Sequence, residues 1–371
     1  MEKRVDMKGA SIRELEISIG KYPTGPNNNI TDVKGIKVGH TTLIEGDHIR
    51  TGVTSILPSS QIFNNKFIAG SFILNGAGEV SGLTQLTEWG LLETPIALTN
   101  TMSVGTVTQG LTQWMSKKYV KIWNFRDVVI PVVGECDDSY LNDCMTFPIT
   151  PDHVVESINN ATSGVIPQGS IGAGTGMICC DVKGGIGSSS REIEIEGKIY
   201  TIGVLVLSNF GEIEDLKLDG LPVGRVLKKE VSQYRLRREN YGSIITVIAT
   251  DLPTSSHQIS RLCKRAALGI GRVGSYAAHG SGEIILGFTT ANVIKHRENK
   301  PHYKLNVILD DHLNSAYRAV IEATEEAIWN SLTYSGDMAG ADGRVVPGVN
   351  LAKVKKIYSK IKKLERELEK S

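Results

Sequence analysis

The chain has 371 residues, of which 40% are hydrophobic and 22% are charged. This composition is typical of a globular protein with a sizeable core, and it excludes a disordered, collagen-like or disulfide-scaffold chain. The net charge is +1, so neither nucleic acid nor an anionic membrane is expected as a partner. No apolar run approaches the ~20 residues that span a bilayer. The charged N-terminus lacks an apolar signal core, which predicts a cytoplasmic protein.

The first 30 residues are rich in turn-forming types, most densely at 23–29, and predict a loose N-terminal arm over residues 1–29. Short β-prone runs separated by glycine and proline follow as far as residue 100. These predicted strands cover 35–42, 53–57, 67–74 and 96–99. A first helix is then predicted over 104–117, and buried strands are predicted over 128–133 and 200–207.

The C-terminal third has the clearest periodicity. A strongly β-prone run at 243–250 is followed by the helix cap Pro253-Thr254-Ser255 and by a helix with a one-sided apolar stripe that ends at Gly271. A strand at 282–290 precedes a second long helix, capped by Asp310 or Asp311. With no linker between residues 30 and 345, we expect a single α/β domain of sandwich type, with sheets inside and helices outside.

Residues 351–371 form a separate feature, a basic C-terminal helix with apolar residues along one face. Such a helix can bind a membrane surface or dock on its own protein, and docking is the favoured interpretation.

Metal and cofactor motifs are missing from the sequence. The five cysteines are odd in number and form no CxxC pair, and the histidines form no HExxH, so no metal and no organic cofactor is expected. The run Gly172-Ala-Gly174-Thr-Gly176 suggests a nucleotide loop, but it precedes a strand-like run rather than opening a helix. Two interpretations stay open: a tight turn beside a site, or a purely structural glycine loop.

A serine nucleophile is possible only by an unusual route, because the sequence contains no GxSxG elbow. In an N-terminal nucleophile the chain is cut before Ser, Thr or Cys, and the new α-amine acts as the base. Among six Gly-Ser pairs, only Gly242-Ser243 opens a long apolar strand that leads into a capped helix. Glycine also permits the dihedrals that an intramolecular attack requires. A structural Gly-Ser at a strand start is the competing interpretation.

The segment 242–253 resembles the processing site of the DmpA-type aminopeptidases, which include L-aminopeptidase/D-esterase-amidases and β-peptidyl aminopeptidases. The resemblance extends from residue 30 to about residue 343, with landmarks at 74–79, 134–143, 172–191 and 279–284. It implies an αββα sandwich and self-cleavage into residues 1–242 and 243–371. The two chains would stay together, and the processed units would form a homo-oligomer.

The resemblance also implies a set of site residues. Ser243 matches the nucleophile, and the cut falls between Gly242 and Ser243. Ser281 and Glu283 match the supporting pair that orients the α-amine. Asn209 matches the asparagine of the oxyanion hole, and Tyr140 matches the active-site tyrosine. Glu135 matches the acidic residue that meets the substrate's amino group. Without the resemblance, each of these is also explained as a structural polar residue.

The implied substrate is a small peptide, amide or ester with a free amino group, which the enzyme would hydrolyse without a cofactor. Two alternatives remain. One is an acyltransferase like the ornithine acetyltransferases, which share a similar fold but use threonine as the nucleophile. The other is a non-catalytic binding or assembly protein that never cleaves itself.

Overall fold

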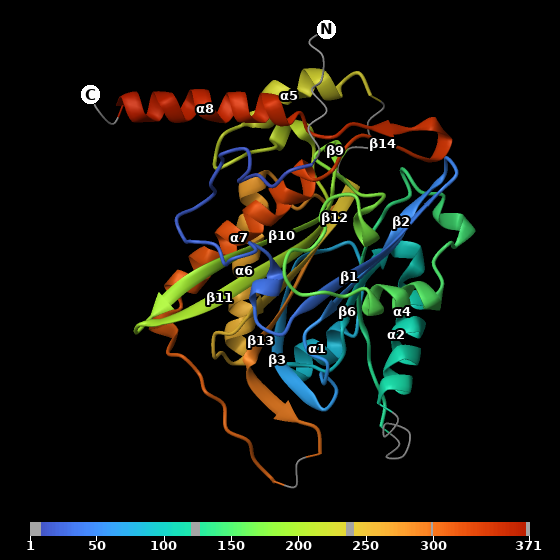
Figure 1. Cartoon of the computed structure of the whole chain (residues 1–371), viewed down its shortest axis with the longest axis vertical. Helices are drawn as coiled ribbons and strands as arrows, with labels where there is room; N and C mark the ends of the chain where they lie inside the picture. Colours follow the sequence, from blue (N-terminus) through green and yellow to red (C-terminus); the bar gives the residue numbers. More distant parts are fainter. Residues whose placement is uncertain (1–8, 120–126, 235–240, 298–299, 369–371) are drawn as a thin grey trace.

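The computed structural model describes residues 9–119, 127–234, 241–297 and 300–368, which fold into four layers (Figure 1). Two sheets pack face to face, and a pair of helices covers the outer face of each sheet. The first sheet has the strand order β10 (Gly185–Ile195), β11 (Lys198–Asn209), β12 (Tyr241–Thr250), β13 (Gly280–Lys295), β3 (Asn65–Gly76) and β5 (Leu91–Leu92). The second has the order β1 (Lys37–Glu45), β2 (Ile49–Leu57), β6 (Ile96–Asn100), β7 (Val132–Cys136) and β4 (Val80–Ser81).

Helices α6 (Ser256–Val273) and α7 (Asn314–Thr333) cover the six-stranded sheet, while α2 (Val104–Lys118) and α4 (Pro151–Asn159) cover the five-stranded sheet. Alternation along β12 shows how the layers form: Ile245 and Val247 face the other sheet, whereas Ile244 and Ile248 pack towards α6 and α7. The predicted αββα sandwich is therefore confirmed.

The cap predicted for α6 is present, because the Ser255 side chain accepts a hydrogen bond from the Gln258 N–H while Gln258 bonds back to the Ser255 N–H. The helix ends at Val273 and is capped by Gly274, rather than ending at Gly271. The strand predicted over 128–133 begins only at Val132, since Val128 and Ile130 are exposed.

The expected loose N-terminal arm is wrong from residue 9 onwards. Ile12, Ile17 and Ile19 are fully buried against the helices on the outer face of the six-stranded sheet. The turn-forming residues are fixed by side-chain hydrogen bonds, such as the one from Asn28 Nδ2 to Glu326 Oε1 at 2.6 Å. The composition predicts the turns correctly, but hydrogen bonds and packing hold these turns against the rest of the protein. Residues 1–8 lie outside the described residues.

The C-terminal helix α8 (Leu351–Leu368) lies across one end of the molecule beside α5 (Val223–Val231) (Figure 1). Its first turns dock through buried Val354 and Tyr358, whereas Leu364 and Leu368 near its end are exposed. Within the described part of the chain, no helix has both the length and the apolar character needed to cross a bilayer.

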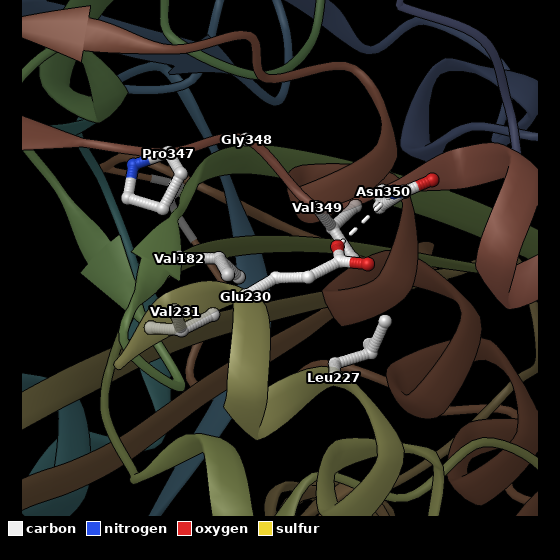
Figure 2. Close-up of a pocket in the computed structure, with 8 residues that line it drawn as sticks. All are labelled: Val182, Leu227, Glu230, Val231, Pro347, Gly348, Val349 and Asn350. Atoms are coloured by element: carbon white, nitrogen blue, oxygen red, sulfur yellow. Dashed lines mark hydrogen bonds between the residues drawn. The ribbon is translucent and has the colours of Figure 1, made fainter. Parts of the chain in front are cut away.

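A small cavity lies where α8 begins (Figure 2). The Glu230 carboxylate at its edge accepts hydrogen bonds from Asn350 Nδ2 at 3.1 Å and from Lys353 Nζ at 2.8 Å. The cavity volume is about 10 Å³, which accommodates at most one water molecule. This cavity is therefore a packing contact of α8 rather than a ligand pocket.

A buried ion pair ties strand β10 to the helical layer. Arg191 on β10 is fully buried, and its Nη2 lies 2.6 Å from Glu326 Oε2 on α7. We expect Arg191→Met to lower the free energy of unfolding by about 3 kcal/mol, because the buried Glu326 loses one of its two guanidinium partners and keeps only Arg13, at 2.6 Å. Urea denaturation measures this change. The control, Lys228→Met, breaks the exposed pair with Glu214 and leaves the midpoint unchanged; equal effects of the two substitutions would contradict the argument.

Candidate active site

Strand β12 lies between an antiparallel neighbour and a parallel one. Ser243, near its start, is directly opposite Asn209, the last residue of β11. On the other side Ser243 pairs with Gly282 of β13, and Gly242 pairs with Ser281. The register therefore gathers four of the predicted site residues around the peptide bond between Gly242 and Ser243.

Gly242 occupies a position that accepts no side chain. Its φ of +156° lies at the edge of the region that favours glycine. A Cβ at this position would lie 2.3 Å from the Asn209 carbonyl oxygen and 2.8 Å from the Phe210 Cα. The close approach of β11 thus requires glycine immediately before Ser243.

The Ser243 side chain faces the space between the two sheets and is only 4% exposed. Asn209 lies on the same face, since directly opposed residues of an antiparallel pair project to one side with Cβ atoms about 5 Å apart. The buried thiol of Cys136, at the end of β7, is within hydrogen-bonding reach of the Ser243 hydroxyl, and burial raises the pKa of this thiol. Ser243 is thus held at the junction of the two sheets.

Both ends of the Asn209 amide are held by backbone groups. Its Oδ1 accepts a hydrogen bond from the Ile178 N–H at 2.9 Å, and its Nδ2 donates to the Asp137 carbonyl at 2.9 Å. These two bonds fix which atom is the oxygen and which is the nitrogen. The donor end of the amide consequently lies on the face of the sheet that carries the Ser243 hydroxyl.

Ser281 and Glu283 form a hydrogen-bonded pair on β13, in which the Ser281 hydroxyl donates to Glu283 Oε1. Their neighbours in the strand show that they face the α6 and α7 side of the sheet, opposite to the Ser243 side chain. Burial raises the pKa of Glu283, and hydrogen bonds from Ser281 and Ser275 partly counteract this shift. Oε2 of Glu283 is buried and makes no hydrogen bond to any described residue.

Glu135 on β7 is buried beneath an exposed loop. Its carboxylate accepts a hydrogen bond from the Glu79 N–H at 2.8 Å and another from the Thr101 hydroxyl. Gly78 of this loop connects it to the site, because a Cβ there would lie 3.1 Å from Glu135 Oε1 and 3.9 Å from the Cα of Gly282. Burial raises the pKa of Glu135, and the charges of Asp137 and Glu79 raise it further. This acidic environment suits a substrate ammonium group.

Tyr140 is connected to the other predicted site residues through the backbone of its loop. Its ring lies against the Arg344 guanidinium, 5.0 Å from the ring centroid, and its carbonyl accepts a hydrogen bond from Arg344 Nη1. Its loop reaches the site through Asp137, whose carbonyl binds Asn209. The structure therefore connects Tyr140 to Asn209 through the backbone of its own loop.

Three residues near the site were missed by the sequence analysis. Cys136 contacts Ser243, Ser275 donates to Glu283 at 3.4 Å, and the Asn75 amide donates to the carbonyls of Ala278 and Ser281 at 2.6 and 2.5 Å. Asn75 and Cys136 lie in segments that the sequence analysis used as landmarks, but nothing in their spacing indicated these contacts. Among the described residues, no three His, Cys, Asp or Glu side chains are grouped so that they could hold a metal.

Comparison with known proteins identifies the class. Peptidase family S58 matches residues 28–346, and the chain belongs to this family. The beta-peptidyl aminopeptidase BapA of Sphingosinicella microcystinivorans is 37% identical over 377 residues, which cover 96% of this chain and 94% of that protein.

Solved structures agree with this assignment. A beta-aminopeptidase from Burkholderia sp. has a TM-score of 0.85 and 38% identity, over 94% of this chain and 97% of that chain. The L-aminopeptidase D-Ala-esterase/amidase of Ochrobactrum anthropi, a prototype serine aminopeptidase with a variant Ntn hydrolase fold, has a TM-score of 0.88 and 33% identity. That match covers 95% of this chain and 98% of the other.

The resemblance to the DmpA-type family is therefore confirmed. The chain is a hydrolase of the aminopeptidase and amidase type, with an Ntn hydrolase fold that suits a serine nucleophile. The relatives support this function rather than the acyltransferase or the non-catalytic alternative.

Two glycine substitutions test the packing at the head of β12. We expect Gly242→Ala to lower the melting temperature and abolish activity, because its Cβ would collide with the β11 backbone. Gly271→Ala, on the exposed side of α6 with nothing within 4 Å of the added Cβ, should instead raise stability by up to about 1 kcal/mol. Calorimetry measures both changes. Normal stability and activity in Gly242→Ala would show that the β11 backbone can move to accommodate a Cβ, and would contradict the packing argument.

Proposed function

We propose that this protein is a self-processing serine aminopeptidase that cuts its own chain between Gly242 and Ser243. The processed enzyme would then hydrolyse small peptides, amides or esters that carry a free amino group. One observation carries the proposal: the register sets Ser243 opposite Asn209, and Gly242 beside Ser281.

Self-cleavage begins when Ser243 Oγ attacks the Gly242 carbonyl carbon and the peptide nitrogen leaves as an amine. This N-to-O shift converts the amide into an ester. A water molecule hydrolyses the ester and leaves a carboxylate on Gly242 and a free α-amine on Ser243. The amine is a competent base near neutral pH, since the unperturbed pKa of an α-amino group is about 7.7–8.0.

In turnover, the α-amine accepts the proton of Ser243 Oγ as this oxygen attacks the acyl carbon of the substrate. The Asn209 amide is on the correct face of the sheet to donate a hydrogen bond to the developing oxyanion, and Tyr140 adds a donor from the adjoining loop. The leaving group then departs with the proton. Water hydrolyses the acyl-enzyme and restores the amine.

The new α-amine replaces a backbone nitrogen and thus lies between the two faces of the sheet. Ser281 and Glu283 approach it from the helix side, so they can orient the ammonium without obstructing the nucleophilic oxygen. The buried Oε2 of Glu283 provides an acceptor for this ammonium.

Glu135 is proposed to bind the substrate's own ammonium group. Its carboxylate lies below the loop that touches Gly282, so a substrate on Ser243 could place its amine nearby. The relatives include a beta-aminopeptidase and an L-aminopeptidase D-Ala-esterase/amidase. We therefore include β-amino as well as α-amino substrates of either hand.

Cytoplasmic location and assembly into a homo-oligomer of processed units belong to the same proposal. The exposed Leu364 and Leu368 at the end of α8 offer apolar surface that a second copy could bury. Neither nucleic acid nor a membrane is proposed as a partner. Analytical ultracentrifugation determines the assembly, and a mass equal to one α/β unit would contradict it.

Ser243→Ala tests the nucleophile. We expect one full-length band on a denaturing gel and turnover reduced by at least about a thousandfold, since both steps lose their attacking oxygen. The matched control is Ser71→Ala, which also changes a Gly-Ser pair and should process normally. Two fragments from Ser243→Ala would assign the cut to another residue or to a protease.

Glu283→Gln tests the base through the pH dependence of kcat/KM. A carboxylate beside the α-amine favours its protonated form and raises its pKa, so removal of the charge lowers that pKa. The acidic limb should then move to lower pH in processed Glu283→Gln enzyme, after correction for titration of the substrate's amine. An acidic limb at the same pH would show that Glu283 does not influence the pKa of the base.

Glu135→Gln tests recognition of the substrate amine. Loss of one charge with the shape retained should raise KM for free-amine substrates about tenfold, equivalent to about 1.4 kcal/mol. The kcat should change much less. The control is Glu88→Gln, on the exposed side of α1 (Leu83–Trp89), which should leave KM unaltered. An unchanged KM in Glu135→Gln would show that another residue binds the substrate's amine.

A further inference from the structure

A buried lysine lies against the end of the glycine-rich run at 172–176. Lys183 on the short strand β9 (Val182–Lys183) is fully buried, and its Nζ donates to the carbonyls of Gly174 at 3.1 Å, Met177 at 2.7 Å and Gly184 at 2.7 Å. A nucleotide loop turns its N–H groups towards phosphate, whereas this loop turns carbonyls towards a cation. The motif that the sequence left open is therefore a cradle for the Lys183 ammonium.

The cradle is tightly packed and admits no side chain. A Cβ on Gly174 would lie 2.4 Å from the Ile186 nitrogen, and a Cβ on Gly176 would lie 2.3 Å from the Arg50 carbonyl oxygen. The carbonyls around Lys183 are consequently held in place by the neighbouring strands.

One peptide group connects this cradle to the candidate active site. The Met177 carbonyl, which accepts from Lys183 Nζ, and the Ile178 N–H, which donates to Asn209 Oδ1 at 2.9 Å, belong to the same planar amide. An ammonium at the carbonyl oxygen polarises this amide and makes its N–H a stronger donor. Hydrogen bonds in such a chain strengthen one another, so the effect reaches the Asn209 amide.

The hydrogen bonding of Lys183 matches the charged form. An ammonium has three N–H groups and no acceptor, and Lys183 Nζ has three carbonyl partners. Burial lowers the pKa of Lys183 to about 7, while the charge of the buried Asp138 opposes this shift. Asp138 follows Asp137, whose carbonyl accepts from Asn209 Nδ2. The Oδ1 end of the Asn209 amide is thus connected to Lys183 through one peptide group, and its Nδ2 end to the backbone of the loop that carries Asp138.

We propose that Lys183 is a positioning residue for the reaction, which orients and polarises the Asn209 amide through the peptide group between Met177 and Ile178. This inference rests on the role proposed for Asn209 in the oxyanion hole. Its chemical content is that Lys183 strengthens the hydrogen bond that Asn209 donates in the transition state, without touching the substrate.

A double-mutant cycle tests the proposal. Lys183→Met, Asn209→Ala and the double variant are compared by kcat and KM on an amino-acid amide, with kcat counted per processed chain. We expect Lys183→Met alone to lower kcat about tenfold with KM changed less than about twofold. In the Asn209→Ala background the same substitution should lower kcat less than about twofold, because residues acting through one group are not additive.

The matched control is Ser335→Ala. Ser335 Oγ donates to the Gly184 carbonyl at 3.0 Å, so this variant removes a hydrogen bond to one wall of the cradle but none to the connecting peptide. It should leave kcat within about twofold of the parent. A tenfold loss in Ser335→Ala would show that any disturbance of this loop lowers kcat, and would overturn the proposal.

Other outcomes are equally decisive. An equal kcat loss from Lys183→Met in both backgrounds, or no loss at all, overturns the connection to Asn209 while its oxyanion role stands. An unchanged kcat in Asn209→Ala alone refutes that role and the inference together. If Lys183→Met does not fold, the cycle is run with Lys183→Gln, which keeps amide donors but removes the charge, and the same criteria apply.

Discussion

The close approach of β11 to the start of β12 is the constraint on which the site depends. At Gly242 the two backbones are so near that no Cβ fits, and this proximity sets Ser243 directly opposite Asn209. The parallel pairing with β13 fixes the other side and places Ser281 beside Gly242. A slip of one residue would turn the Ser243 hydroxyl into the helical layer, so the register of one strand positions the proposed nucleophile, the proposed oxyanion donor and the proposed scissile bond together.

The hydroxyl oxygen and the α-amine of the proposed nucleophile are contacted by residues from different layers of the sandwich. The Ser243 oxygen faces the space between the sheets, where Asn209 and Cys136 lie. The α-amine would arise in the plane of the sheet, where Ser281 and Glu283 approach it from the helix side. This separation allows the base to be oriented and its proton affinity adjusted without placing a carboxylate next to the developing oxyanion.

Buried charge surrounds the site, and each charge has a specific partner. Glu135 is held by a backbone N–H and a hydroxyl, so its carboxylate is fixed before a substrate arrives. Lys183 is held by the carbonyls of Gly174, Met177 and Gly184, and the charge of Asp138 favours its ammonium form. Groups buried in this way are costly to remove from water unless they are hydrogen-bonded, and their rigidity suits a site that must be assembled before catalysis.

The sequence alone determined the elements with strong local signals. The β-prone run at 243–250, the Ser255 cap and the helix stripe gave β12 and α6, and the ordered landmarks gave the family and its αββα fold. Only the tertiary structure decided which distant residues meet, because strand pairing depends on sheet order and register. It showed that the N-terminal segment, expected to be loose, is packed against the helical layer. It also showed that the glycine motif contacts Lys183, which one peptide group connects to Asn209. Nothing in the local pattern around Lys183 encodes that contact, since periodicity reports which face a residue occupies and not what packs against it.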